Sequence, residues 1–213
     1  MNRPPDNLPA RETRHLRGLE LREAPKDSGL LGVLAGYAAV FDSDSVKLGG
    51  YDGGFIERVA RGAFKRSLTE SPEVFALWQH DPAQVIARSP DTLTLAEDER
   101  GLRVEIGLPD TTTARDLLAR VRAKIVDAMS FGFTVREQTW QQRDGQPDLR
   151  TLTDVDLFEV SAVVWPAYPE TTLAVRSHEQ WRKSINPPAS SLPAPASIFS
   201  ERSYWESRLG LRK

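Results

Sequence analysis

A few side chains in this sequence have the types needed for nucleophilic catalysis. A serine hydroxyl becomes a nucleophile when an imidazole accepts its proton, and a carboxylate can orient that imidazole. The chain has three histidines. His15 and His178 fall in segments predicted to be flexible or at a domain boundary, so His80 is the candidate base. It follows an apolar run at the start of a turn, where a strand can fix it and a loop can leave it open. The alternative is an ordinary structural histidine.

Ser130 lies in a segment that alternates in character, Met-Ser-Phe-Gly-Phe-Thr-Val over residues 129–135. Period-two alternation places the apolar residues on one face of a strand and Ser130, Gly132 and Thr134 on the other. The apolar face suits a core. The small polar face favours close approach of a substrate backbone, because Gly132 has no Cβ. Most strand serines are merely solvated, so Ser130 needs a nearby base to act as a nucleophile.

Glu159 is the candidate carboxylate. Strict alternation over residues 155–163 places it in a row with Val155, Leu157 and Val163. A carboxylate in an apolar row requires a partner, which could be an imidazole N–H. An arginine on a neighbouring strand is an equal alternative, and Asp154 or Asp156 could replace Glu159 as the third member.

Other chemistries find no support in the sequence. There is no cysteine, and the histidines lack zinc-ligand spacing, so we expect neither disulfides nor a metal site. The glycines of residues 49–54 lack the Lys-Ser/Thr of a phosphate loop, and we expect no cofactor. A formal net charge of −2 gives no electrostatic sign of nucleic-acid binding. No apolar run of 18 residues predicts a membrane span.

The elements that must position these residues are mostly strands. The hydrophobic pattern predicts strands at residues 30–41, 74–80, 102–108, 129–135 and 155–164. It predicts helices at residues 57–68 and 113–127, the second with Thr113 and Asp116 as its capping pair. Many strands with two interposed helices indicate an α+β, mainly β, architecture or a barrel.

Composition divides the chain into four parts. Residues 1–14 are rich in proline and charge and predict a flexible N-terminal arm without a secretory signal. Residues 15–182 form the domain. Residues 183–197 are a Pro/Ser/Ala-rich linker, and residues 198–213 are a tail or docking peptide.

Several segments together resemble the caudovirus prohead maturation protease family, whose fold is related to herpesvirus assemblin. They are Gly-Tyr-Ala-Ala-Val-Phe at 36–41, Phe-Ile-Glu at 55–57 leading to Gly-Ala-Phe at 62–64, Leu-Trp-Gln-His-Asp at 77–81, Met-Ser-Phe-Gly-Phe at 129–133, and Asp-Leu-Phe-Glu-Val-Ser at 156–161 running to Trp-Pro-Ala-Tyr-Pro at 165–169. Ala87 departs from the pattern, since relatives more often have glycine before the arginine.

The resemblance implies a herpesvirus-protease-like β-barrel flanked by helices and a serine endopeptidase. It implies Ser130 as nucleophile, His80 as base and Glu159 as the third member. The implied substrates are the major capsid protein and the scaffold protein, with self-cleavage in the terminal segments. The implied location is the assembling prohead in the host cytoplasm, and the herpesvirus relatives imply a homodimer. The rival interpretations are a catalytically silent assembly or scaffold protein with the same fold, and an unrelated binding barrel.

Overall fold

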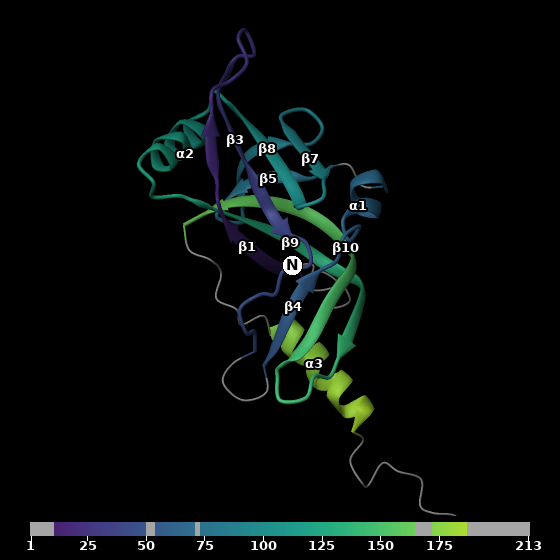
Figure 1. The fold of residues 1–213 in the computed structure, drawn as a ribbon. Coiled ribbons are helices and arrows are strands. Elements are labelled where there is room, and N and C mark those ends of the chain that lie inside the picture. Colours follow the sequence, from purple (N-terminus) through teal and green to yellow (C-terminus); the bar gives the residue numbers. More distant parts are fainter. Residues whose placement is uncertain (1–10, 50–53, 71–72, 165–171, 187–213) are drawn as a thin grey trace, which may run out of the picture. The chain divides into compact units, whose positions relative to one another are not determined.

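The computed structural model describes residues 11–49, 54–70, 73–164 and 172–186, with side chains from residue 174 in the last range. The chain divides into two compact units, residues 1–175 and 176–213. The first unit holds all the strands described here. Its architecture is mostly β with few helices (Figure 1).

Six strands form the larger sheet, in the order β1-β9-β10-β5-β6, with β4 also paired to β10. Their bounds are β1 Glu12–Arg17, β4 Phe55–Val59, β5 Phe75–Trp78, β6 Asp81–Arg88, β9 Ala128–Gln141 and β10 Asp148–Val163. Strands β4 and β5 run parallel to β10, whereas β9 runs antiparallel to it. The two longest strands, β9 and β10, therefore pair with each other in the interior of this sheet (Figure 1).

Four strands form the second sheet, in the order β2-β3-β8-β7. Their bounds are β2 Glu20–Arg22, β3 Leu30–Val40, β7 Leu93–Glu97 and β8 Gly101–Pro109. The main core cluster draws on both sheets: it includes Leu34 and Ile106 from the second sheet and Phe131 and Phe133 from β9. The described strands thus form two sheets that share a core, so the closed β-barrel that the family resemblance implies is not observed among the described residues.

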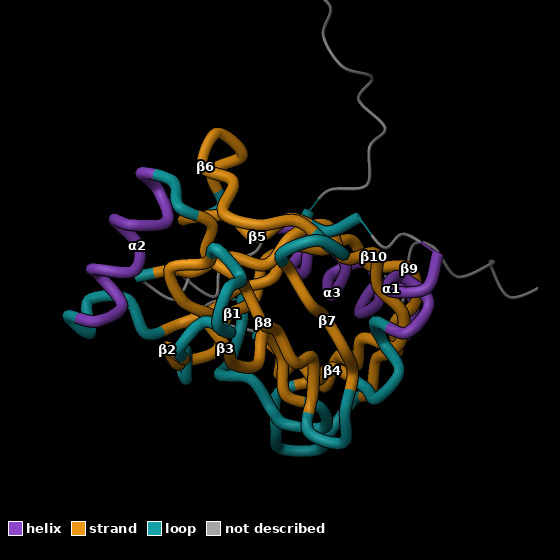
Figure 2. Tube along the Cα trace, turned by 90° about the horizontal axis from the view of Figure 1, so that it is seen from above, coloured by secondary structure: helices purple, strands orange, loops and turns teal. Residues whose placement is uncertain are grey.

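The structure describes three helices: α1 Lys65–Glu70 and α2 Thr112–Arg122 in the first unit, and α3 Thr172–Ile185, most of which belongs to the second. Helix α2 packs against β3, β6 and β8, and α1 against β10 and β7. Figure 2 shows these two helices at opposite ends of the strands. Four residues of the expected apolar stripe, Ala114, Leu117, Leu118 and Val121, are buried as their spacing predicts, whereas Ile125 lies beyond the end of α2 and is exposed.

The predicted helix at residues 57–68 is wrong over most of its length. Residues 55–59 instead form β4, with Phe55, Glu57 and Val59 buried in alternation against β10. Gly62 has a φ of 87°, which breaks any helix at that point. Only the last few residues join α1, because the apolar spacing that suggested one helix is divided between a strand, a turn and a helical turn.

The other predicted elements lie where the pattern placed them, with different ends. Strand β10 begins seven residues earlier than expected, at Asp148, and β9 continues to Gln141. Helix α2 ends sooner than expected, and Lys124 beyond it has a φ of 58°. Its N-cap is Thr111, whose side chain accepts from the Ala114 amide, so the predicted capping pair of Thr113 and Asp116 is wrong.

Candidate active site

His80 is held at a tight turn between β5 and β6. Both Gln79 and His80 have positive φ angles, of 58° and 61°. Such angles are uncommon for residues other than glycine and carry a cost that the surroundings must offset. The Gln79 amide donates to the Ala162 carbonyl of β10 at 3.1 Å, which ties the turn to the sheet. The turn thereby fixes His80 beside β10.

The imidazole of His80 is bound to Glu159. Nδ1 of His80 lies 2.7 Å from Oε1 of Glu159, and the carboxylate side chain is only 9% exposed. A carboxylate accepts, so this contact places the proton of a neutral ring on Nδ1. Nε2 is then the basic nitrogen, and it is buried with no hydrogen-bond partner in the part of the chain that the structure describes.

A β-bulge decides which face of β10 carries Glu159. Leu157 lies opposite Phe133 of β9, but after an extra residue at 158 Glu159 lies opposite Gly132. Glu159 and Leu157 therefore lie on opposite faces, and the expected row of Glu159 with Val155 and Leu157 is wrong. Strict alternation cannot register an inserted residue, and bulges often redirect a side chain beside an active site.

Ser130 lies two residue pairs away from Glu159, on the same face of the sheet. It is opposite Ser161 of β10 in the register that places Gly132 opposite Glu159. Diagonal neighbours of this kind on adjacent strands are about 7–8 Å apart. The sheet therefore brings Ser130, Glu159 and, through its carboxylate, His80 to one region. In this structure the Ser130 hydroxyl donates to the backbone carbonyl of Arg14 on β1 at 2.8 Å, and the side chain is fully buried.

Gly132 has no Cβ, and the carboxylate of Glu159 occupies the space where a Cβ would lie. A Cβ at this position would overlap Oε1 of Glu159 and lie 3.0 Å from its Cδ. The sequence suggested that this glycine admits a substrate backbone. In the structure a side chain of the protein itself occupies that space. The second carboxylate oxygen, Oε2, accepts a hydrogen bond from the buried hydroxyl of Ser161.

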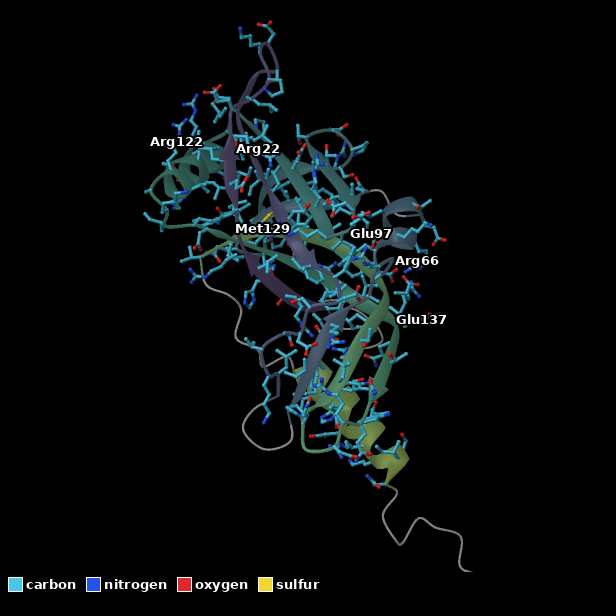
Figure 3. All side chains as sticks on the ribbon, in the orientation of Figure 1. Arg22, Arg66, Glu97, Arg122, Met129 and Glu137 are labelled. Atoms are coloured by element: carbon cyan, nitrogen blue, oxygen red, sulfur yellow. The ribbon has the colours of Figure 1, made fainter. Side chains whose placement is uncertain are left out.

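The neighbouring aspartates are engaged elsewhere. Asp154 and Asp156 both accept from the guanidinium of Arg66, at 2.7 and 2.6 Å, and Asp156 also pairs with Arg136. Burial alone would raise the pKa of Asp156, but hydrogen bonds from Arg66 and Arg136 outweigh it and hold that pKa below 3.8. Arg66 lies on α1, toward the β10 side of the fold (Figure 3). Of the three carboxylates considered, Glu159 is the one that contacts His80.

His15 also lies near the site, although the sequence pattern does not predict it there. It lies in β1 directly opposite Ser130, so strand β1 begins before the expected end of the flexible arm at residue 14. Burial, then the charge of Arg14, then that of His80 lower its pKa below 6.5. A second imidazole therefore flanks the candidate nucleophile in the neutral form at pH 7. His178 is buried on α3, with its ring stacked on Trp181.

Buried ion pairs fasten β1 to the rest of the larger sheet. Arg150 of β10 is 1% exposed and donates to Glu12 at 2.8 and 2.9 Å and to Glu57 of β4 at 2.8 Å. Arg14 binds the same two carboxylates. Two arginines and two glutamates thus balance each other's charge where burial would make a lone charge costly.

Within the described residues, no group of three or more His, Cys, Asp or Glu side chains could hold a metal ion. Among the helices that the structure describes, none is long and apolar enough to cross a membrane. The described site consists of a hydroxyl, two imidazoles and a carboxylate with their hydrogen-bond partners. Such a set supports proton transfer and nucleophilic attack without a bound cofactor.

Comparison with known proteins bears directly on this chemistry. The model of the caudovirus prohead serine protease family matches residues 18–184. A solved structure, the capsid assembly protease gp21 of bacteriophage T4, is similar with a TM-score of 0.45 and 11% identity, over 72% of this chain and 99% of that chain. No curated protein matches the chain. The family match spans most of the sequence, including every candidate residue named above except His15. The chain therefore belongs to the caudovirus prohead serine protease family and is a serine protease of capsid maturation.

Proposed function

We propose that Ser130, His80 and Glu159 are the catalytic triad of this protease, as nucleophile, general base and orienting carboxylate. The observation that carries the proposal is the 2.7 Å contact between His80 Nδ1 and Glu159 Oε1, made on the face of the sheet that also holds Ser130. With its proton on Nδ1, His80 has Nε2 free to accept a proton from a hydroxyl.

The reaction follows acyl transfer. Ser130 Oγ attacks the carbonyl carbon of a peptide bond while its proton passes to Nε2 of His80. The C–N bond of the tetrahedral intermediate then breaks, and Nε2 returns the proton to the departing amine. Water attacks the resulting ester by the same sequence and frees Ser130. Throughout, Glu159 accepts a hydrogen bond from Nδ1–H of His80 and stabilises the charged ring without taking its proton.

The hydroxyl of Ser130 must turn before it can react. It now donates to the Arg14 carbonyl, and in the proposed reaction it leaves this neutral acceptor for Nε2 of His80. Ser161 faces Ser130 across the two strands, but its proton is donated to the Glu159 carboxylate. Hydrogen bonds to charged acceptors are roughly twice as strong as neutral ones. The Ser130 hydroxyl is therefore the easier of the two to redirect toward His80, and we assign it as the nucleophile.

The substrates that we infer are the capsid and scaffold proteins of the assembling prohead in the host cell, together with terminal segments of this chain itself. By analogy with herpesvirus assemblin, the active form that we infer is a homodimer. No nucleic acid or membrane takes part in this proposal. A protease enclosed with its substrates acts at high local concentration, which suits a limited, well-timed set of cleavages.

One experiment tests the nucleophile and the activity together. The chain is co-expressed with its cognate capsid and scaffold proteins, and fragments are identified by mass spectrometry for the wild type and for Ser130→Ala and Ser161→Ala. Ser130→Ala is expected to abolish cleavage. In parallel, the wild type is treated with a fluorophosphonate and the modified peptide is mapped. Modification of Ser161 or unchanged cleavage by Ser130→Ala would refute the assignment.

A further inference from the structure

We propose that Ser161 is a positioning residue that fixes the Glu159 carboxylate for its contact with His80. This inference rests on the proposed triad and adds a residue to it. Ser161 lies two positions after Glu159 on β10 and on the same face, after the bulge has redirected that face. Its hydroxyl donates to Oε2 while Oε1 binds His80, so both carboxylate oxygens have defined partners.

The surroundings explain why the carboxylate needs this support. Glu159 has a flexible side chain, and a carboxylate held by one hydrogen bond can rotate about its terminal C–C bond. Gly132 gives it room but no hydrogen bond, because the glycine contributes only the absence of a Cβ. Ser161 is fully buried, so water does not compete for its hydroxyl. The hydroxyl thus sets the rotation at which Oε1 faces Nδ1.

The same hydrogen bond separates the roles of two neighbouring serines. Ser130 and Ser161 face each other across β9 and β10, so their hydroxyls could bond to one another or compete for His80. Because Ser161 donates to Glu159, its proton is held by the carboxylate and is not presented to His80 Nε2. Glu159 therefore discriminates between two hydroxyls of identical chemistry and leaves Ser130 to react.

The test is a double-mutant cycle on Ser161 and Glu159. Ser161→Ala is expected to lower kcat by about 10- to 100-fold with little change in KM, as the loss of an orienting partner does. Glu159→Gln should lower kcat further. In the Glu159→Gln background, Ser161→Ala should cause no additional loss, because a residue that acts through the carboxylate has no effect once the carboxylate is gone. The rate of Ser130 modification by a fluorophosphonate should follow the same pattern.

Two further variants serve as controls, one for the loss of a buried hydroxyl elsewhere and one for unfolding of Ser161→Ala. Thr134→Val removes a buried hydroxyl from the same face of β9, one that reaches Asp156 and not Glu159, and its kcat should stay within about threefold of wild type. Ser161→Cys keeps nearly the volume with a weak donor, and it serves if the alanine variant unfolds. Multiplicative losses in the cycle, or a normal kcat for Ser161→Ala and Ser161→Cys, would overturn the inference. A normal kcat for Glu159→Gln would instead refute the triad itself.

Discussion

Ser130, His80 and Glu159 differ in how far the sequence could place them. The alternation of residues 129–135 predicts a strand with Met129, Phe131 and Phe133 in the core, and this is confirmed. The position of His80 at a strand end is likewise as predicted. The face of Glu159 was predicted wrongly, because the bulge at residue 158 adds one residue that no hydrophobic period reveals.

Gly132→Ala tests the fit of the carboxylate at the level of single atoms. The new Cβ would overlap Oε1 of Glu159 and push it away from His80. A displacement of about 1 Å at a catalytic group can cost about 100-fold in rate, so we expect a loss of that size in kcat. Initial rates on a peptide substrate, corrected for the folded fraction, provide the measurement.

Gly107→Ala is the matched control for this change. Gly107 is crowded too, with a side-chain carbon of Leu30 only 2.8 Å from where its Cβ would lie, but it belongs to β8 of the other sheet. Gly107→Ala should lower the free energy of unfolding by about 1–3 kcal/mol through overpacking and leave kcat per folded molecule unchanged. Equal kcat losses in both variants would mean that Gly132 matters only for packing.

Strand β1 shows, at the level of elements, what hydrophobic patterning misses. Its one buried side chain among residues 12–17 is Glu12, and its remaining side chains are polar except for Leu16. Strand prediction relies on an apolar face, which β1 lacks because ion pairs fasten it instead. The hydrophobic pattern therefore does not predict that His15 lies at the site. Glu12 and Arg14 carry opposite charges two residues apart. This spacing places both side chains on one face of a strand and is the weak indication of β1 that the sequence contains.

Arg150→Ala tests that attachment. The change removes one arginine of a nearly buried group and leaves Glu12 and Glu57 with a single cation between them. Removing one partner of a buried ionic group costs about 3–5 kcal/mol, and the free energy of unfolding in urea should fall by that amount. Arg61→Ala breaks an exposed pair with Asp42 and should cost less than about 1 kcal/mol. Similar losses in the two variants would refute the structural role of the buried group.

Stability as a function of pH is a property of the whole molecule. Folding lowers the pKa of His15 below its ordinary 6.5, so below about pH 6.5 the unfolded chain binds a proton more readily and stability falls. Folding also lowers the pKa of Glu12: burial alone would raise it, but hydrogen bonds and charge from Arg150 and Arg14 hold it below 4.5. That contribution is present above about pH 4.5 and is lost as the pH falls through the lower pKa of the folded state.

Urea unfolding at several pH values between 7.5 and 3.5 should therefore show two declines in the free energy of unfolding. His15→Gln should flatten the decline that begins near pH 6.5, and Glu12→Gln should reduce the steeper decline below pH 4.5. Asp156, whose pKa is also lowered, contributes to the second decline in both variants. An unchanged profile for His15→Gln would show that this histidine titrates alike in the folded and unfolded chains.

The buried ionic group of Glu12, Arg14, Glu57 and Arg150 makes the stability of the enzyme depend on an intact strand β1. Clipping the chain ahead of Arg11 would leave both pairs of opposite charges intact. A cut after Arg17 would instead detach Glu12 and Arg14 together, and with them the carbonyl that holds the Ser130 hydroxyl. Arg150 and Glu57 would retain one another, but β9 would then have an exposed edge along Ser130. The two cuts are only a few residues apart but differ in outcome. The cut ahead of Arg11 should leave a stable, active enzyme, whereas the cut after Arg17 should give a less stable protein with an exposed strand edge that can aggregate.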